Sequence, residues 1–328
     1  MLITFTKKGI YCPLGNFYID SLFPVDTNII THAHSDHARF GSQNYISHKL
    51  SVPILKLRLG NEINVNGFEY NEIFNIKGIK ISLHPAGHII GSSQVKVEYQ
   101  GEIVVVAGDY KVEDDNISTK FEPLKCNTFV TESTFGLPVF KWQKQELVFE
   151  EINNWWKENQ EGGLNSIILS YTLGKSQRIL KGIDTSIGKV ICHGATQNIN
   201  NLFRQNGILL PDSFKVDDFK NKGDITGSLI IAPSSVLGTS WLRRFYPYSI
   251  SQASGWMQIR GIKKRAALDR GFVLSDHADW EGLNWAIKQT SAENIFVKHG
   301  YKSILTRWLN SKGFNAKEVA EVEEVAED

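Results

Sequence analysis

The sequence has few cysteines, and their placement argues against a cross-linked protein. Cys12, Cys126 and Cys192 are odd in number and widely spaced, and no CxxC pair occurs. This pattern indicates neither a disulfide framework nor a zinc site built from cysteines. We therefore expect a protein of the reducing cytoplasm.

Long apolar runs, repeats and an excess of one charge are also missing. No stretch approaches the roughly 18 apolar residues that span a bilayer, and the N-terminus MLITFTKKGI lacks the apolar segment of a signal peptide. The absence of a fixed-period repeat excludes solenoids. The formal net charge is only +1, which taken alone argues against a nucleic-acid partner, because proteins that bind phosphate backbones usually carry an excess of basic residues. The chain is thus expected to be neither secreted nor membrane-inserted.

The residues that are present are those of an ordinary globular protein. The chain has 328 residues, of which 41% are hydrophobic and 22% charged. Short β-branched runs end abruptly in polar residues and alternate with longer amphipathic stretches, which predicts an α/β fold with polar side chains gathered at one sheet edge. The expected strands are residues 27–31, 103–106, 128–130, 167–169, 190–191, 272–274 and 295–297, and the expected helices are 143–159, 280–289 and 302–311.

Candidate metal ligands are most concentrated in the hexapeptide from His32 to His37, His-Ala-His-Ser-Asp-His, which follows an expected strand. Imidazole suits zinc, and a carboxylate among histidines suits a site completed by water. His88 and Asp109 add two candidate ligands, the aspartate directly after another strand. The alternatives are a solvated polar loop, a pH-responsive histidine cluster and, for His88, an ordinary buried histidine.

The hexapeptide from His32 to His37, then His88, then Asp109 after a strand resemble, in this order along the chain, the metal-binding motifs of the metallo-β-lactamase superfamily. Three further segments look like motifs A, B and C of its β-CASP nuclease branch, and together the motifs span nearly the whole chain. The segments are Thr131–Gly136 with Glu132, Ser275–Asp279 with His277, and Lys298–Gly300 with His299.

The resemblance implies a metallo-β-lactamase αββα sandwich interrupted by an inserted β-CASP α/β domain. Residues 1–141 and 265–328 would form the sandwich, and residues 142–264 the insertion, which would hold nucleic acid over the metals. It also implies two Zn²⁺ ions, with Mn²⁺ as the alternative. The implied ligands are His32, His34 and His88 for one ion, Asp36, His37 and His299 for the other, and Asp109 between them.

The same resemblance implies hydrolysis of a phosphodiester by a water activated between the two ions. His277 would protonate the leaving oxygen, with Glu132 orienting its ring, and Asp36 would be catalytic as well as a ligand. The alternatives are a purely positional His277 and a purely structural Glu132.

Two local features point to different substrates. A histidine in motif C, here His299, is common among RNA-acting members of the branch. The segments Ser254–Gly261 and Phe272–Trp280 instead resemble bacterial exonucleases that act with an ATP-dependent DNA ligase and a helicase. We expect a DNA exonuclease in DNA repair, with an RNA-processing nuclease as the alternative. A catalytically silent nucleic-acid-binding subunit and a small-molecule hydrolase are further alternatives.

Residues of the expected insertion are candidates for gripping the substrate. Ser170–Ser176 is not a P-loop, because Leu169 stands where that motif requires glycine. A glycine turn into a helix would still let Lys175 and Arg178 contact phosphate. Residues 241–270 are basic and contain several aromatic residues, which is typical of a surface that binds nucleic-acid strands. The candidates there are Ser254, Trp256 and Arg260; ordinary solvated charges and core aromatics are the alternative.

Overall fold

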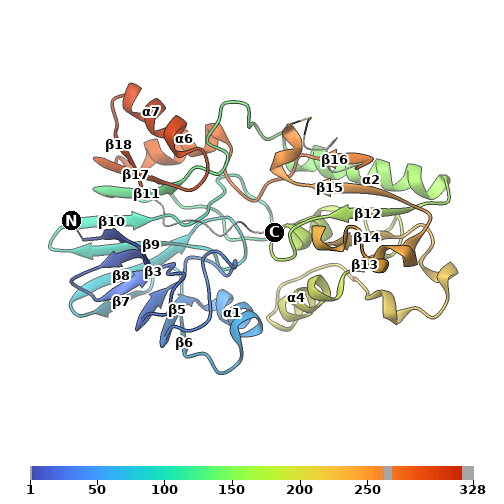
Figure 1. Ribbon diagram of the computed structural model, residues 1–328, viewed down its shortest axis with the longest axis horizontal. Coiled ribbons are helices and arrows are strands. Elements are labelled where there is room, and N and C mark those ends of the chain that lie inside the picture. Colours follow the sequence, from blue (N-terminus) through green and yellow to red (C-terminus); the bar gives the residue numbers. More distant parts are fainter. Residues whose placement is uncertain (1, 260, 262–267, 320–328) are drawn as a thin grey trace. The chain divides into compact units, whose positions relative to one another are not determined.

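The computed structural model describes residues 2–259, 261 and 268–319 and shows two compact units (Figure 1). The first contains the chain up to Lys141 and resumes at His277, and the second is Trp142–Asp276. The second unit extends past the expected end at residue 264, because β16 (Arg270–Phe272) pairs with β15 (Tyr248–Ala253). Arg260 and residues 262–267 lie outside the described residues.

The first unit contains two mixed sheets. The six-stranded sheet follows chain order: β1 (Thr4–Thr6), β2 (Gly9–Cys12), β3 (Phe17–Ile19), β4 (Thr27–Ile29), β5 (Asn44–His48) and β6 (Val65–Phe68). The seven-stranded sheet has the order β18 (Asn315–Glu318), β17 (Asn294–Lys298), β11 (Thr128–Glu132), β10 (Glu102–Val106), β9 (Ser93–Tyr99), β8 (Ile79–Pro85) and β7 (Ile73–Ile76).

Strand alternation explains how these sheets pack. Val104 and Val106 of β10 join a buried cluster that contains side chains of both sheets, whereas Val105 between them joins a cluster with two helices. Those helices are α6 (Trp280–Thr290) and α7 (Lys302–Ser311), which lie beside β11 and β17 (Figure 1). On the six-stranded sheet, α1 (Val52–Leu59) contacts β6. The layers are those of an αββα sandwich, which confirms the expected fold class.

The second unit is built on a parallel five-stranded sheet in the order β13, β14, β12, β15, β16. Its strands are buried on both faces, as expected for a parallel sheet. The elements not yet given are β12 (Asn165–Leu169), β13 (Val190–Cys192), β14 (Leu229–Ala232), α2 (Gln145–Glu161), α3 (Lys175–Gly182) and α4 (Gly194–Gln205). Short 3₁₀ helices are η1 (Lys49–Ser51), η2 (Val216–Asp218), η3 (Lys222–Ile225), η4 (Ser234–Val236), η5 (Ser240–Phe245) and η6 (Gly255–Gln258).

The expected strands and helices all exist, but the expected single sheet edge is wrong. β4 belongs to the six-stranded sheet, β10, β11 and β17 to the seven-stranded sheet, and β12, β13 and β16 to the sheet of the second unit. The polar residues after these strands therefore belong to two separate units. Among the helices of the described residues, none combines the length and apolarity that crossing a bilayer requires.

Candidate active site

Four buried ligand atoms of the first unit converge on one point. His34 Nδ1 lies 3.2 Å from His32 Nε2 and 3.1 Å from His88 Nε2. Asp109 Oδ2 lies 3.5 Å from His32 Nε2 and 3.9 Å from His88 Nε2. Two nitrogen ligands about 2.0–2.1 Å from one tetrahedral zinc ion would lie about 3.3–3.4 Å apart. The spacing and the three-histidine, one-carboxylate donor set thus fit a metal ion.

A second group of ligand atoms adjoins the first. His32, Asp36 and His37 offer atoms within 4.8 Å of one another. His37 Nε2 lies 3.4 Å from Asp36 Oδ2 and 3.5 Å from Asp109 Oδ2, and it is buried without a hydrogen bond. A buried nitrogen facing two carboxylates suits a cation between them. Asp109 therefore borders both groups, as a bridging ligand would.

His299 lies at the margin of this second group. Its ring centroid is 5.8 Å from that of His37. Among the described residues, it does not join the groups whose ligand atoms lie within 4.8 Å of one another. The sequence motif thus brings His299 to the expected side of the cluster, at a longer distance than the other expected ligands.

The electrostatics of the two groups favour positive charge between them. Burial lowers the pKa of His37, but the carboxylates of Asp36, Asp109 and Asp20 outweigh burial and hold that pKa well above its usual value. Burial alone would raise the pKa of Asp109, yet the neighbouring histidines, His37 first, hold it well below its usual value. A bound metal cation would likewise compensate the negative charge of these carboxylates.

Asp20 is a candidate site residue that was not expected from the sequence. It follows β3 and is buried, with Oδ2 2.7 Å from His37 Nδ1. Its carboxylate also accepts hydrogen bonds from the Thr31 backbone N–H and hydroxyl, at 2.8 and 2.6 Å. A carboxylate behind a metal-binding histidine fixes the ring and its tautomer. The only local signal was an aspartate directly after the short apolar run Phe17–Ile19.

Backbone geometry brings Asp109 close to the histidine loop. Gly108, between β10 and Asp109, has φ +59°, and a Cβ there would lie 2.7 Å from Thr31 Cβ. Only glycine combines this left-handed conformation with so close an approach. Gly108 therefore lets the strand end pass against Thr31, which directly precedes His32.

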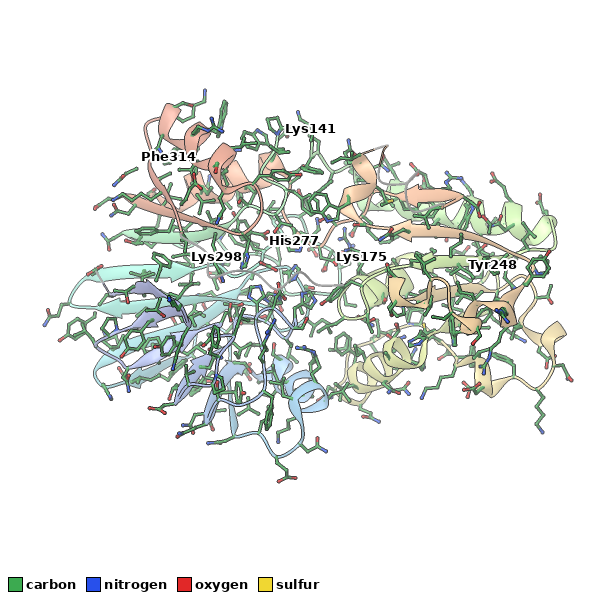
Figure 2. The ribbon with its side chains drawn as sticks, in the orientation of Figure 1. Lys141, Lys175, Tyr248, His277, Lys298 and Phe314 are labelled. Atoms are coloured by element: carbon green, nitrogen blue, oxygen red, sulfur yellow. The ribbon has the colours of Figure 1, made fainter. Side chains whose placement is uncertain are left out.

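Glu132 and His277 form a second arrangement beside the metal ligands. His277 Nδ1 lies 3.0 and 2.9 Å from the two Glu132 oxygens, and the Tyr110 backbone N–H donates to Oε1 at 2.9 Å. The Ala278 backbone N–H donates to the Tyr110 carbonyl at 2.7 Å. His277, labelled in Figure 2, is part-buried and its ring centroid is 4.6 Å from that of His88. The geometry directs Nδ1 of His277 to the Glu132 carboxylate.

Lys175 and Arg178 lie in the first turn of α3 after Gly174, as expected, but both side chains form ion pairs within the second unit. Arg178 is only 3% exposed, and both side chains pair with the carboxylate of Asp276 inside the second unit. A guanidinium buried in this way presents no open face to a phosphate. The expectation that Arg178 contacts substrate phosphate is therefore not supported by its position.

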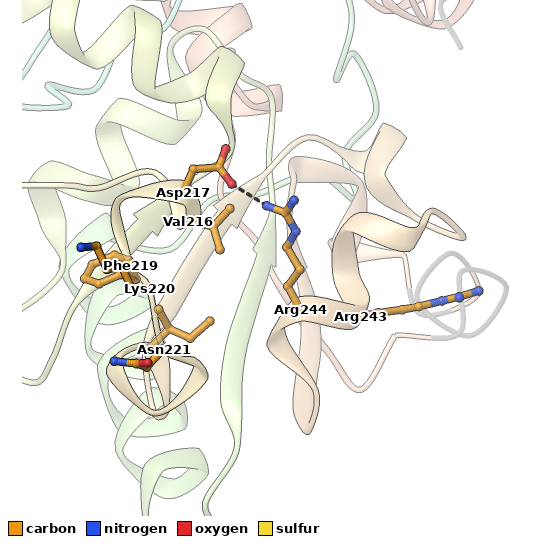
Figure 3. A pocket seen from close by; sticks show the side chains of 8 residues that line it. Val216, Asp217, Phe219, Lys220, Asn221, Arg243 and Arg244 are labelled. Atoms are coloured by element: carbon orange, nitrogen blue, oxygen red, sulfur yellow. Dashed lines mark hydrogen bonds and ion pairs between the residues drawn. The ribbon is translucent and has the colours of Figure 1, made fainter.

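The other candidate substrate-binding residues of the second unit differ in their burial and in their surroundings. Ser254 caps η6 by accepting from the Trp256 N–H at 3.3 Å, and both residues are part-buried. Of the basic segment, Arg243 and Arg244 help to line a pocket of about 440 Å³, and Arg244 pairs with Asp217 at 2.8 Å (Figure 3). Arg260, Lys263, Lys264 and Arg265 lie outside the described residues.

Comparisons with known proteins find relatives whose names refer to enzymes and factors that act on nucleic acids. No protein-family model matches the chain. A protein of Opitutus terrae named Probable DNA ligase is 25% identical over 96% of this chain and 31% of its own length. Endoribonuclease ysh-1 of Neurospora crassa is 24% identical over 51% of this chain, and Cleavage and polyadenylation specificity factor 73 of Drosophila melanogaster is 25% identical over 37%. The chain thus spans less than a third of each of these relatives.

A solved structure shares the fold. A protein of unknown function from Enterococcus faecalis aligns with a TM-score of 0.62 at 13% identity, over 91% of this chain and 80% of that one. At this identity the likeness concerns the fold alone.

Proposed function

Because the chain belongs to the β-CASP branch of the metallo-β-lactamase superfamily, we propose that it is a metal-dependent nuclease that hydrolyses phosphodiester bonds. The observation that carries the proposal is the convergence of His32, His34, His88 and Asp109 beside the Glu132–His277 pair. Metal ligands alone would also suit a binding protein. A part-buried histidine oriented by a buried carboxylate adds a group that can move a proton at the same place.

We assign the metal ligands as the motifs imply. His32, His34 and His88 would hold one Zn²⁺ ion, Asp36, His37 and His299 the other, and Asp109 would bridge them, with Mn²⁺ as the alternative metal. When bound, two such ions supply an activated water and neutralise charge on the phosphate oxygens. Asp20 holds His37 by Nδ1, so that Nε2 faces the ligand cluster. Asp36 is half-buried, and it would be catalytic as well as a ligand.

His277 and Glu132 would serve the departing oxygen. Glu132 accepts from His277 Nδ1 and thereby leaves Nε2 as the nitrogen that can carry a proton to the leaving group. Since Glu132 is buried and is itself held by the Tyr110 N–H, the imidazole cannot swing freely. A restrained imidazole would keep its proton close to the leaving oxygen, and general acid catalysis requires this proximity.

We propose DNA as the substrate, with digestion from an end, and a role in repair beside an ATP-dependent DNA ligase and a helicase. The support is that the relative matching 96% of the chain is named a probable DNA ligase, and that residues 254–261 resemble the ligase-associated exonucleases. The second unit would be the β-CASP insertion, and Ser254, Trp256, Lys175 and Arg260 would lie on the substrate path. Three buried, free cysteines suit a cytoplasmic location.

RNA is the second candidate substrate. His299 in motif C and the relatives named endoribonucleases favour it. End-labelled DNA and RNA oligonucleotides of matched sequence, single- and double-stranded and with each end blocked in turn, distinguish the candidates. The DNA proposal predicts loss of terminal nucleotides from DNA with an open end, whereas internal cleavage of RNA would support the alternative.

Asp109→Ala tests the nuclease proposal as a whole. We expect this variant to lose bound metal, measured by atomic emission, together with nearly all cleavage. Asp114→Ala is the control, because Asp114 is exposed in the same loop. A wild-type protein that binds two metal equivalents yet cleaves neither DNA nor RNA would contradict the proposal and favour a silent nucleic-acid-binding subunit.

A further inference from the structure

The hydroxyl of Thr31 lies behind the candidate metal ligands of the first unit and contacts three side chains at once. Thr31 directly precedes His32 and is 1% exposed. Its Oγ1 atom lies 2.6 Å from Asp20 Oδ2, 3.1 Å from His32 Nδ1 and 3.3 Å from His37 Nδ1. His32 belongs to both groups of candidate ligands, and His37 belongs to the second. One buried hydroxyl therefore contacts histidines of both groups.

The main chain and the packing around Thr31 fix the position of this hydroxyl. The Thr31 N–H donates to Asp20 Oδ1 at 2.8 Å, and the Thr31 carbonyl accepts from the Ser93 N–H at 2.7 Å. Gly108 packs so closely on the side chain that a Cβ at Gly108 would lie 2.7 Å from Thr31 Cβ. Because the residue is buried, solvent does not compete for the hydroxyl. The hydroxyl is thus held between Asp20 and the two imidazole rings.

The number of hydrogens on this hydroxyl decides which nitrogen of His32 is available to a metal. A threonine hydroxyl donates one hydrogen and accepts with two lone pairs. The carboxylate of Asp20 can only accept, so the hydroxyl hydrogen points to Asp20 Oδ2. Towards His32 the hydroxyl can then only accept, and Nδ1 of that ring carries the hydrogen. The lone pair of the neutral ring is therefore on Nε2, which lies 3.2 Å from His34 Nδ1 and 3.5 Å from Asp109 Oδ2.

Thr31 contributes more to His32 than to His37. The nearer acceptor for His37 Nδ1 is Asp20 Oδ2, at 2.7 Å against 3.3 Å for Thr31 Oγ1. Within the part of the chain that the structure describes, Thr31 is the one hydrogen-bond partner of His32 Nδ1. We propose that Thr31 is a positioning residue, which fixes His32 as a ligand through Nε2. This inference rests on the proposed function, in which His32 holds a metal ion.

Two substitutions of Thr31 separate the hydroxyl from the shape of the side chain. Thr31→Val keeps the branched shape and removes the hydroxyl, whereas Thr31→Ser keeps the hydroxyl and removes a methyl group. Thr290→Val is the matched control, because Thr290 is also 1% exposed in the first unit and its hydroxyl bonds to the Ile287 carbonyl and the Ala292 N–H. Competition with a chelating dye measures the zinc affinity of each full-length protein. ¹H–¹⁵N NMR of the zinc-loaded proteins locates the ring hydrogen of His32 and follows its exchange with water.

For Thr31→Val we expect the zinc affinity to fall roughly 10–100-fold, as is common when the partner of a ligating histidine is removed. Thr31→Ser and Thr290→Val should stay within about 3-fold of wild type, because neither removes such a partner. In the wild-type protein and in Thr31→Ser the ring hydrogen of His32 should be on Nδ1 and exchange slowly. In Thr31→Val this hydrogen should lose its protection from exchange, because its acceptor is gone.

Four results would overturn the proposed role of Thr31. A ring hydrogen on Nε2 of His32 in the wild-type protein would contradict the assigned ligand atom, and wild-type zinc affinity in Thr31→Val would remove any role of the hydroxyl. Equal losses in Thr31→Val and Thr31→Ser would show that shape matters, and an equal loss in Thr290→Val would show that the unit is destabilised in general. Should Thr31→Val fail to fold, judged by circular dichroism, the ring hydrogen of the wild-type protein still tests the assignment, since it needs no variant.

The proposed function fails by a different result. A wild-type protein that binds zinc but cleaves neither DNA nor RNA would contradict the nuclease proposal. The role of Thr31 would stand in that case, because neither the zinc affinity nor the ring hydrogen of His32 depends on cleavage. Conversely, a wild-type protein that cleaves nucleic acid while Thr31→Val binds zinc normally would contradict the role of Thr31 alone.

Discussion

His37 Nδ1 lies 2.7 Å from Oδ2 of Asp20, and this contact decides which nitrogen of the ring faces the metal ligands. Because Asp20 accepts from Nδ1, the proton of the neutral ring is on Nδ1 and the lone pair is on Nε2. Nε2 is the atom that lies between Asp36 and Asp109. Asp20, which is outside the candidate ligand groups, thus orients a candidate ligand, His37.

Asp20→Asn should weaken metal binding. The amide can still accept from the Thr31 N–H, but it cannot hold the protonated Nδ1 of His37 as an ionised carboxylate does. We expect a loss of roughly 10–100-fold in affinity at the second group of ligands, as is common when the partner of a ligating histidine is removed. Competition with a chelating dye measures it. Asp26→Asn, an exposed site nearby in the chain, should leave the affinity unchanged; equal affinities in the two variants would exclude this role for Asp20.

Glu132→Gln should slow cleavage without removing metal. The amide retains the size of Glu132 and can accept one hydrogen bond, but it no longer stabilises a positively charged His277. We expect kcat to fall roughly 10–100-fold, the usual scale for a disturbed general acid. Steady-state kinetics and metal analysis on one preparation measure both quantities. Exposed Glu122→Gln is the control. Loss of metal would instead identify Glu132 as a ligand.

The cluster of candidate metal ligands was predictable from sequence because its residues are close together in the chain or directly follow a recognisable strand. His32, His34, Asp36 and His37 lie within six positions, and Asp109 follows a run of valines. Asp20 has no such neighbours, and its partner His37 is 17 residues away. A single aspartate after a three-residue strand carries too little local signal to be distinguished from an ordinary turn residue.

Long-range pairing explains why the ion pair of Arg178 was not foreseen from the sequence. A lysine and an arginine after a glycine turn have the local pattern of a phosphate site, but Asp276, the partner of Arg178, lies 98 residues further along the chain. The same limit applies to the sheets. The runs at 103–106 and 167–169 look alike in sequence, and only the pairing of β10 with β9 and of β12 with β14 assigns them to different units.

Gly300→Ala should destabilise the first unit far more than a similar change nearby. Gly300 has φ +65°, and a Cβ there would lie 2.3 Å from the Ser133 carbonyl oxygen. Gly313 has φ +88°, and a Cβ there would meet nothing within 4 Å. Both alanines carry the strain of a left-handed residue, about 1 kcal/mol, whereas the backbone clash should bring the loss at Gly300 to about 3 kcal/mol or more.

Urea unfolding of the two glycine variants separates strain from clash. The difference between their free energies of unfolding reports the contact with Ser133, because the conformational cost is shared. Gly300 directly follows His299, so we also expect Gly300→Ala to bind less metal. Equal free energies of unfolding for the two variants would show that the backbone at Ser133 shifts away from the new Cβ at little energetic cost, contrary to this prediction.

Two buried histidines away from the metal ligands should make the first unit sensitive to acid. Burial lowers the pKa of His48 to about 4, and burial followed by the Lys96 charge lowers that of His84 to about 4, against 6.5 for an exposed ring. The unfolded chain therefore takes up protons on these residues between about pH 6.5 and pH 4 while the folded chain does not. The stability that they contribute is complete above pH 6.5 and is lost as the pH falls towards 4.

His48→Asn isolates one of these contributions. His48 Nδ1 accepts from the Leu50 N–H at 3.3 Å as the cap of η1, and asparagine can accept the same bond without titrating. A shift from 6.5 to about 4 corresponds to at most about 3 kcal/mol. We expect the difference in unfolding free energy between wild type and His48→Asn to move in favour of the variant by up to this amount between pH 7 and pH 4.5. Urea titrations at half-unit steps of pH, with chelator present in every sample, measure it, since the metal-binding histidines titrate alike in both proteins. A difference that stays constant with pH would mean that the folded protein accommodates a charged His48, and the neutral, buried ring would then not be a source of acid sensitivity.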